Sequence, residues 1–223
     1  MSIQSNVKEF QNLAKQHDIK VAAVSKTKPV EDLMEAYETG QRLFAENKVQ
    51  ELVAKYEEMP KDIEWHMIGH LQRNKVKYIA PFVHLIHSVD SARLLKEVNK
   101  QGAKVNRKID CLLQVHIAKE ESKFGFSEDE MVHLFESEEI KAYKNVMIIG
   151  LMGMATFTEN ENVVRSEFKE LKQLFEKLKN YQAENVDLRE LSIGMSGDYP
   201  IAIEEGSTFI RVGSKIFGAR NYQ

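Results

Sequence analysis

Two lysines follow the first strand-like run of this chain. Because burying a charged side chain at the end of an apolar strand is costly, their position calls for a physical explanation. Lys26 and Lys28 come at the end of the apolar run Val21–Ser25. Because Ala22, Val24 and Lys26 have the same parity, their side chains share one face of a strand. If that face is the interior of a barrel, desolvation disfavours the charged form of the Lys26 amine, and a second cation at Lys28 adds to this. A neutral amine is what Schiff-base chemistry requires, whereas the alternative is a pair of solvated loop lysines.

Two short stretches rich in glycine and serine lie near the end of the chain. Residues 194–197 read Gly-Met-Ser-Gly and precede a helical pattern, and residues 211–214 read Arg-Val-Gly-Ser and precede a short turn. Backbone N–H groups at the start of a helix bind phosphate well, and glycine lets a ligand approach the backbone closely. The stretches therefore predict a phosphate site, with ordinary turn chemistry as the alternative. The predicted contributors are Met195, Ser196, Gly213 and Ser214.

A reactive lysine and a phosphate site together suggest one ligand that carries an aldehyde and a phosphate. Pyridoxal 5′-phosphate has both groups. Arg211 would then lie near the pyridine nitrogen, and because arginine does not give up its proton, that nitrogen would stay unprotonated. Such a ring is a weak electron sink. The alternative for Arg211 is a salt bridge inside the fold.

The elements that would position these residues alternate regularly along the chain. Eight strand-like runs are separated by patterns with apolar residues at helical spacing. This alternation predicts a parallel sheet, and eight units predict a closed (β/α)8 TIM barrel that occupies residues 1–223 as a single domain. An open doubly wound sheet is the alternative. The predicted strands are Val21–Ser25, Arg42–Glu46, Glu64–Ile68, His84–Val89, Ile109–Ile117, Val146–Met152, Leu188–Ile193 and Phe209–Val212.

The two ends of the chain favour closure of the barrel. About eleven residues follow the last predicted strand, too few for a full eighth helix. An apolar stripe at Ile3, Val7, Phe10 and Ala14 has helical spacing and would fill that place. In such barrels the active site lies at the carboxyl ends of the strands, where this sequence places its polar and glycine-adjacent residues.

The spacing of the histidines bears on whether they could bind a metal ion. His66 and His70 flank the third predicted strand, where four residues span roughly 13 Å, so one metal ion cannot bridge them. His84 and His87 are three apart on a strand and should face opposite ways. The sequence therefore predicts no metal site, with His66 as a satisfied core histidine and His70 as a ligand candidate at the loop.

Composition excludes several classes of function. The net charge is −3 with acids and bases interspersed, so no basic stripe for nucleic acid is expected. No apolar run approaches the ~20 residues of a membrane span, and the polar N-terminus does not resemble a secretory signal. Cys111 is the single cysteine, which excludes an intramolecular disulfide and predicts a buried free thiol in a reducing cytoplasm.

Seven motifs distributed over nearly the whole chain resemble those of the pyridoxal-phosphate homeostasis proteins, which are single-domain barrels of the alanine racemase N-terminal-domain type. The first and last motifs are the most specific. The motifs are AVSKTKP, FAENKVQE, WHMIGHLQRNK, SVDS, ESKFG, GLMGMA and LSIGMSGDYPIAIEEGSTFIRVGSKIFG.

The resemblance implies a role for each matching position. Lys26 would form a Schiff base with pyridoxal phosphate, and Asn47 and His70 would line the pocket. Arg211 would face the pyridine nitrogen. Met195, Ser196, Gly213 and Ser214 match the phosphate side. The family is thought to hold the cofactor for vitamin B6 homeostasis without established catalysis, so pyridoxal-phosphate-dependent apoenzymes are possible recipients, and a monomer or a dimer is compatible with the sequence.

Three residues depart from the family pattern, and two other functions are compatible with the sequence. Ala45 stands where the family usually has glycine, Lys48 where tyrosine is common and Gly153 where threonine is frequent. One alternative function is a pyridoxal-phosphate-dependent amino-acid racemase, which needs a second base such as Tyr199. The other is a cofactor-free aldolase that uses Lys26, which leaves Arg211 and the phosphate site less well explained.

Overall fold

The strands of this chain close into one barrel. A computed structural model describes residues 2–118, 124–181 and 183–219. Eight parallel strands pair in sequence order, and the last pairs with the first. This confirms the predicted barrel and excludes the open sheet. The strands are β1 (Lys20–Val24), β2 (Leu43–Glu46), β3 (Glu64–Met67), β4 (Leu85–Val89), β5 (Ile109–Gln114), β6 (Val146–Met152), β7 (Val186–Met195) and β8 (Phe209–Val212).

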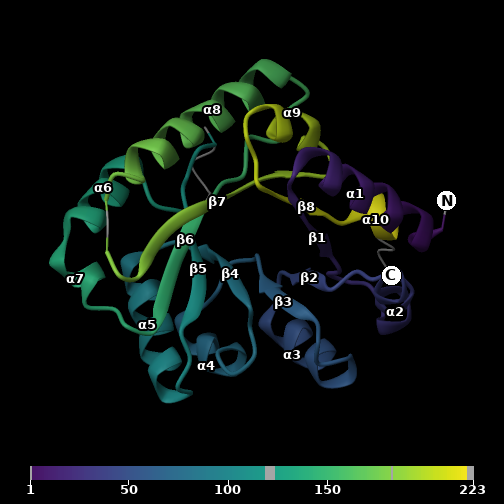
Figure 1. Cartoon of the computed structure of the whole chain (residues 1–223), viewed down its shortest axis with the longest axis horizontal. Helices are drawn as coiled ribbons and strands as arrows, with labels where there is room; N and C mark the ends of the chain where they lie inside the picture. Colours follow the sequence, from purple (N-terminus) through teal and green to yellow (C-terminus); the bar gives the residue numbers. More distant parts are fainter. Residues whose placement is uncertain (1, 119–123, 182, 220–223) are drawn as a thin grey trace.

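Helices surround the barrel and connect successive strands (Figure 1). A 3₁₀ turn, η1 (Arg73–Lys75), precedes α4. The ESKFG motif begins at residue 121, and its residues 121–123 lie outside the described part of the chain. The helices are α1 (Ile3–His17), α2 (Val30–Glu38), α3 (Val49–Glu58), α4 (Val76–Ile79), α5 (Ala92–Lys104), α6 (Glu128–Glu136), α7 (Glu138–Lys141), α8 (Glu161–Leu178), α9 (Tyr199–Glu204) and α10 (Ser214–Phe217).

Local sequence signals set several helix ends. Ser127 and Glu130 form a capping box at the start of α6, in which each side chain accepts a hydrogen bond from the other residue's backbone N–H. Ser91 caps α5 by accepting from the backbone N–H of Leu94. Gly40 follows α2 with φ of 92°, a left-handed conformation that glycine adopts without a steric penalty.

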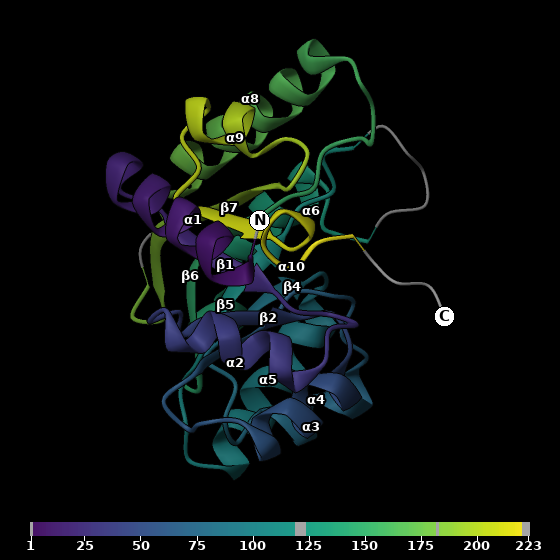
Figure 2. The same cartoon turned by 90° about the vertical axis from the view of Figure 1, so that its right-hand side faces the viewer.

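The first helix fills the place left by the short C-terminal segment. Val7 and Phe10 of α1 are buried, and the Asn6 amide donates a hydrogen bond of 3.0 Å to the carbonyl of Ile216 in α10. The ring of Phe10 meets Tyr199 of α9 edge to face at 5.4 Å. In Figures 1 and 2 the first and last helices of the chain lie side by side. The expected role of the N-terminal apolar stripe is confirmed.

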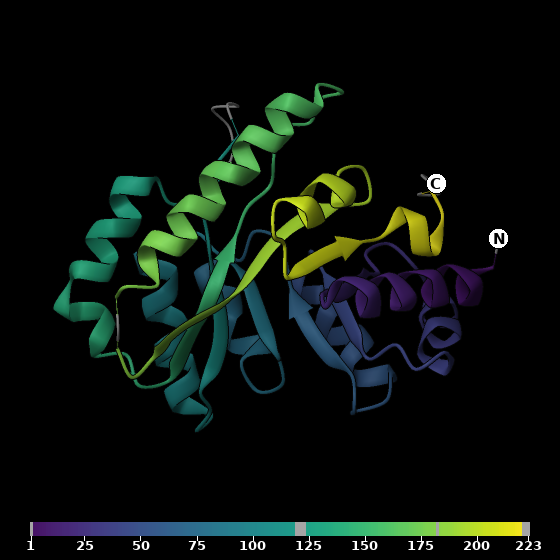
Figure 3. The ribbon, with the colours of Figure 1, turned by 45° about the horizontal axis from the view of Figure 1, so that its top comes forward.

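The apolar core has an inner and an outer part. The outer faces of the strands pack against the helices in a large cluster that contains Trp65, Phe168 and Phe175. The long helix α8 contributes the last two and contacts β7, as Figure 3 shows from above. A smaller cluster inside the barrel contains Ala22 and Val24, as the parity argument for Lys26 predicts.

Cys111 is buried as a free thiol in β5, as predicted, and burial raises the pKa of that thiol. No described helix is long and apolar enough to cross a membrane.

Gly150 is a position where the barrel wall tolerates no side chain. A Cβ added there would lie 1.7 Å from the backbone oxygen of Glu190 in the neighbouring strand β7. We expect Gly150→Ala to force β6 and β7 apart and to lower the free energy of unfolding by about 3 kcal/mol or more, measured by urea denaturation. Gly197→Ala is the control, because a Cβ at Gly197 meets nothing within 4 Å. Equal stability of the two variants would contradict the prediction.

Candidate functional site

A cavity of 560 Å³ opens at the carboxyl ends of the strands, and its lining joins residues from both ends of the chain. Val24 and Lys26 come from the end of β1, whereas Met154 follows β6. Of the eight residues predicted for the site, the structure brings seven to this cavity. They are Lys26, Asn47, Met195, Ser196, Arg211, Gly213 and Ser214.

Closure of the barrel brings the lysine and the glycine-rich stretches together. In the pairing of β1 with β8, Ala22 lies opposite Arg211 and Ala23 opposite Val212. The next residue after β8, Gly213, packs against β1 so closely that a Cβ there would lie 3.0 Å from the carbonyl oxygen of Val24. Pairing in this register therefore places the start of α10 beside the segment that leads to Lys26.

Buried polar contacts hold the backbone on the N-terminal side of Lys26. The Ser25 hydroxyl donates a 2.6 Å hydrogen bond to Oε1 of Glu46, and the same oxygen accepts from the Lys55 amine at 2.7 Å. Lys55 Nζ also donates to the carbonyl of Ser25 at 2.7 Å. Burial raises the pKa of Glu46, and the positive charge of Lys55 opposes this. The direction of the Ser25 backbone is thus fixed by an ion pair inside the protein.

The other side of Lys26 is held by the same ion-pair group. Thr27 has φ of 64°, an uncommon conformation for a β-branched residue. Its backbone N–H donates a 2.6 Å hydrogen bond to Oε1 of Glu51, which also accepts from Lys55 at 2.8 Å. Glu46, Glu51 and Lys55 therefore brace both neighbours of Lys26. The i,i+4 spacing of Glu51 and Lys55 indicates a pair on one helix, but nothing in the sequence connects that pair with Glu46 or with the neighbours of Lys26.

Lys28 lines the cavity, but its amine has structural partners. It donates hydrogen bonds to the carbonyls of Phe217 at 2.8 Å and Ala219 at 3.0 Å. Lys28 thereby ties the end of α10 to the loop after β1.

Arg211 is the buried cation of the site. One guanidinium nitrogen donates to the carbonyl and hydroxyl of Ser192 at 2.7 and 2.6 Å, and the other donates to the carbonyl of Gly153 at 3.0 Å. Burial lowers its pKa to about 10, and the charge of Asp198 opposes this effect. Arg211 remains protonated at neutral pH. Among the described residues, Arg211 is held by these hydrogen bonds to neutral oxygens and not by a direct salt bridge, which was the alternative.

Asp198 is a cavity residue that the predicted set omitted. Its carboxylate accepts a 2.5 Å hydrogen bond from the backbone N–H of Met195 and precedes α9. Burial raises the pKa of Asp198, whereas the hydrogen bond from Met195 lowers it. A signal was present in the sequence, because an aspartate directly before a helical pattern is typical of a capping position. Asp198 shapes the loop that carries Ser196.

Asn47 presents an unsatisfied polar atom at the cavity. Its side-chain oxygen Oδ1 is buried and has no hydrogen-bond partner in the described residues. The loop around it is fixed by close packing, since a Cβ on Gly69 would lie 2.2 Å from the Asn47 carbonyl oxygen. Buried polar atoms are nearly always hydrogen-bonded in proteins, so this one is suited to a ligand.

The loop between β6 and α8 forms a wall of the cavity. It contributes Met154, Thr156 and Phe157, whose side chain is almost fully exposed at 98%. The buried carboxylate of Glu167 fixes this loop by accepting hydrogen bonds of 2.7 Å from both the backbone N–H and the hydroxyl of Thr156. The motif GLMGMA covers the start of this loop up to Ala155, whereas no motif pointed to Thr156 or Phe157.

His70 is not among the residues that line this cavity. It lies beside a separate, more open cavity of 620 Å³, where its Nδ1 is 2.9 Å from Asp90 and its ring stacks on Phe124 at 4.0 Å. Its role as a pocket residue stays a prediction.

The structure corrects two expectations about the other histidines. His66 is not fully satisfied, because its buried Nε2 has no partner among the residues described. His84 and His87 do not diverge, since both contact His66, at ring distances of 5.5 and 5.1 Å. The reason is that His84 lies one residue before β4 begins, outside the alternation of the strand.

The three departures from the family pattern fit their surroundings. Ala45 lies inside the barrel in β2 and packs in the inner cluster, so it is not part of a turn. Lys48 is exposed at the start of α3 and does not line the cavity, which makes it a change of helix surface. At Gly153 a Cβ would lie 2.6 Å from Leu171, so a larger residue would need that side chain to move.

Comparisons with known proteins agree with this fold and site. The profile of the family described as alanine racemase, N-terminal domain, matches residues 1–221, so the chain is a barrel of that class. A pyridoxal phosphate homeostasis protein of Aquifex aeolicus is 42% identical over 204 residues, which cover 91% of this chain and 88% of the relative. The chain belongs to the family of pyridoxal phosphate homeostasis proteins.

Solved structures extend this similarity. PipY of Synechococcus elongatus without pyridoxal phosphate superposes with a TM-score of 0.90 at 32% identity, covering 97% of this chain and 100% of that one. PipY with pyridoxal phosphate bound gives a TM-score of 0.88 at 33% identity with the same coverage.

Of the three residues Glu46, Glu51 and Lys55, we expect substitution of Lys55 to lower the free energy of unfolding most. Lys55→Met would leave Glu46 buried beside no cation, so we expect a loss of about 3–5 kcal/mol in the free energy of unfolding at neutral pH. Because burial raises the pKa of Glu46 above 4.5, the folded variant holds a proton there more tightly than the unfolded chain does. The loss should therefore shrink as the pH falls toward 4.5.

The matched control is Lys177→Met. Lys177 pairs with Glu128 at 2.9 Å, but its side chain is 53% exposed. Exposed pairs contribute about 0–1 kcal/mol, so this variant should be close to the wild type in chemical denaturation. A similar loss in both variants, or a Lys55→Met loss that does not depend on pH, would contradict the assigned role.

Proposed function

We propose that this chain holds pyridoxal 5′-phosphate as a Schiff base on Lys26 and takes part in intracellular pyridoxal phosphate homeostasis. One observation carries the proposal. A single cavity has Lys26 and the hydroxyl and N–H donors of Ser196, Gly213 and Ser214 in its lining. Support comes also from PipY, a relative 33% identical whose structure has pyridoxal phosphate bound.

The residues present fit this cofactor. The cavity of 560 Å³ lies in the usual range for a small-molecule site. The buried Oδ1 of Asn47, which has no partner within the described chain, would meet a polar group of the ring. Gly213 leaves the backbone accessible, and its N–H donates at 3.2 Å to the Ser196 hydroxyl, which can turn toward a phosphate. Two hydroxyls and backbone N–H groups are a suitable donor set for that anion.

Pyridoxal phosphate supplies an aldehyde that condenses with a primary amine and releases one water molecule. In this chain the amine is Lys26, and the braced Ser25 and Thr27 keep it aimed into the cavity. Arg211 is held in a fixed position and retains its proton, so a ring nitrogen placed beside it would stay unprotonated. Lys26 and Arg211 would thus hold the cofactor in a form that stabilises carbanions weakly.

The racemase alternative needs a second base, and the structure does not supply Tyr199 for that role. The Tyr199 ring packs on Phe10 and lies beneath the Lys215 amine at 5.1 Å. No tyrosine is among the described residues that line the cavity. We therefore favour a carrier that keeps the reactive aldehyde sequestered in the cytoplasm and passes the cofactor to pyridoxal-phosphate-dependent apoenzymes.

Lys26 should be the point of attachment. We expect purified wild-type protein to show a visible absorption band that borohydride removes, with the reduced adduct mapped to Lys26 by mass spectrometry. Lys26→Ala should lose the band and the adduct while far-UV circular dichroism stays unchanged. Lys28→Ala should keep both, because the Lys28 amine is engaged by two carbonyls. A full adduct in Lys26→Ala would instead assign attachment to another lysine, and a protein that pyridoxal phosphate fails to colour would overturn the proposal.

Ser214 should sense the phosphate and not the aldehyde. Ser214→Asp adds a negative charge at the first residue of α10, a position where acidic residues stabilise a helix. Repulsion at close range is expected to weaken binding of pyridoxal phosphate by at least about tenfold. Pyridoxal, which lacks the phosphate, is the matched ligand and should bind the variant and the wild type equally in equilibrium absorbance titrations. Equal loss for both ligands would place Ser214 outside the phosphate site.

A further inference from the structure

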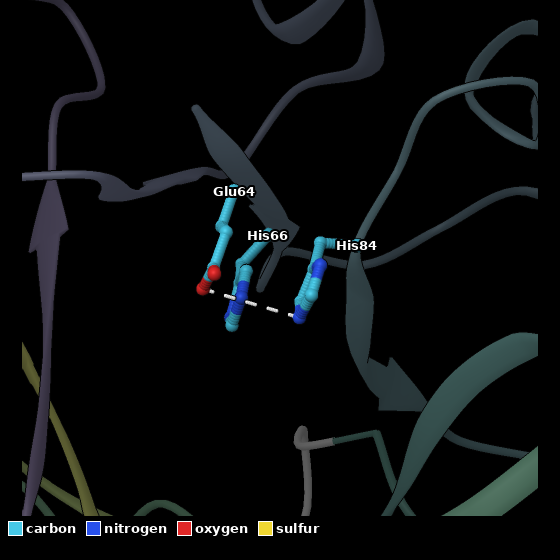
Figure 4. Close-up of side chains that lie close together, drawn as sticks. All are labelled: Glu64, His66 and His84. Carbon is cyan, nitrogen blue, oxygen red and sulfur yellow. Dashed lines mark ion pairs between the residues drawn. The ribbon is translucent and has the colours of Figure 1, made fainter. Parts of the chain in front are cut away.

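A second group of chemically capable side chains lies at the opposite end of the barrel. Glu64 begins β3, His66 follows two residues later, and His84 directly precedes β4. One oxygen or nitrogen atom from each of the three lies within 4.8 Å of the others. Figure 4 shows the three side chains extending in the same direction, with a dashed line marking the ion pair between Glu64 and His84.

Hydrogen bonding holds the ring of His66 in one orientation. The ring is 1% exposed, and its Nδ1 lies 2.8 Å from Nε2 of His87, whose own Nδ1 lies 3.0 Å from the Ser192 hydroxyl. A hydrogen bond at one ring nitrogen orients the other toward a metal ion in most histidine sites.

The remaining nitrogen of His66 has no partner in the described structure. Nε2 is buried and makes no hydrogen bond. When Nδ1 carries the proton and donates to His87, the lone pair of Nε2 is free to coordinate a cation. In the other tautomer an N–H at Nε2 would be buried without an acceptor, which is costly. The orphaned atom is therefore best satisfied as a ligand.

Glu64 and His84 can adjust around this fixed nitrogen. Their side chains are 49% and 52% exposed, and Oε2 of Glu64 lies 3.9 Å from Nε2 of His84. Ligand atoms of a tetrahedral zinc ion lie about 3.3 Å apart, given bonds of about 2.0–2.2 Å. The rings of His66 and His84 are stacked nearly parallel, at 6° and 5.5 Å between centroids. Closing around an ion therefore requires the exposed His84 ring to turn until one of its nitrogens points toward the ion, while the buried ring of His66 stays in place.

Glu64 supplies the negative charge of the group, which would favour the entry of a cation. The nearby cations have acidic partners of their own, since Lys20 pairs with Glu190, and Arg189 pairs with Asp187 and lies 4.0 Å from Asp110.

We propose that Glu64, His66 and His84 bind one divalent transition-metal ion at the amino-terminal end of the barrel, with zinc as the ion that this donor set favours. Two imidazoles and a carboxylate suit zinc and its neighbours in the first transition row, whereas magnesium and calcium prefer oxygen ligands alone. This site is spatially separate from the proposed cofactor site, which lies at the other end of the strands.

The two ends are nevertheless connected through the barrel. From His66 the hydrogen bonds lead to His87 and Ser192, and the Ser192 hydroxyl accepts from Arg211, which lines the cofactor cavity. Binding of an ion at His66 fixes the proton on its Nδ1 and hence the direction of the bond to His87. Through His87 and Ser192, the proposed metal-ligand residue His66 is thus connected by hydrogen bonds to Arg211 of the cofactor cavity.

The test is a titration of the full-length chain, without an affinity tag, with cobalt(II) followed by visible absorbance, and then displacement by zinc. We expect one cobalt ion per chain in the wild type. His84→Ala and Glu64→Gln should each weaken binding by at least about tenfold, the loss typical of disturbing a metal site. Both positions are exposed, so the fold should survive, as circular dichroism would verify. His133→Ala changes an exposed histidine of α6 and is the matched control that should bind like the wild type.

X-ray absorption of the zinc-loaded chain provides the test of His66 itself. Two imidazole ligands are expected for the wild type and one for His84→Ala at saturating zinc. One imidazole in the wild type would remove His66 from the site. Absence of a cobalt spectrum, or equal cobalt affinity in the wild type and His84→Ala, would overturn the proposal, and neither result bears on whether pyridoxal phosphate binds at Lys26.

Discussion

The pairing of β1 with β8 is the constraint on which the functional architecture depends. Lys26 and the stretch 211–214 are separated by most of the chain, and only closure of the barrel makes them neighbours. The register that sets Ala22 opposite Arg211 also presses Gly213 against the backbone of Val24. A shift of this register would separate the lysine from the predicted phosphate donors. Packing of α1 against α9 and α10 covers the same seam from outside.

Charged and hydrogen-bonded side chains are buried inside this barrel, in addition to its apolar core. At the carboxyl end, the ion pair of Glu46 and Lys55 braces the backbone on either side of Lys26. Through the interior, hydrogen bonds link His66, His87 and Ser192 to Arg211. Burying such groups is costly unless they are paired, and here each is engaged by a charged or hydrogen-bonding neighbour. The hydrogen bonds from His66 to Arg211 join the two ends of the barrel at which we propose ligand sites.

Much of the fold was predictable because its signals are local. The eight strands and the caps at Ser91 and Ser127 follow from periodicity and from side chains that bond to nearby backbone. The failures concern contacts between distant segments. Strand alternation does not apply to His84, because it precedes its strand, and its contact with His66 depends on the pairing of β3 with β4. The i,i+4 spacing of Glu51 and Lys55 predicts a pair within α3, but the contacts of Lys55 with Glu46 and with the carbonyl of Ser25 come from other elements.

The sequence by itself determined the fold class and the candidate cofactor residues, because hydrophobic spacing specifies strands and helices, and specific motifs mark Lys26 and the glycine-rich loops. Tertiary structure alone decided which of those residues share a cavity. In the folded chain, His70 lies beside a different cavity and the Lys28 amine donates hydrogen bonds to two carbonyls. Nitrogen Nε2 of His66, near Glu64 and His84, has no hydrogen-bond partner among the described residues. The physical reason is that hydrogen bonding and burial depend on atoms brought together across the barrel, and no spacing along the chain encodes those distances.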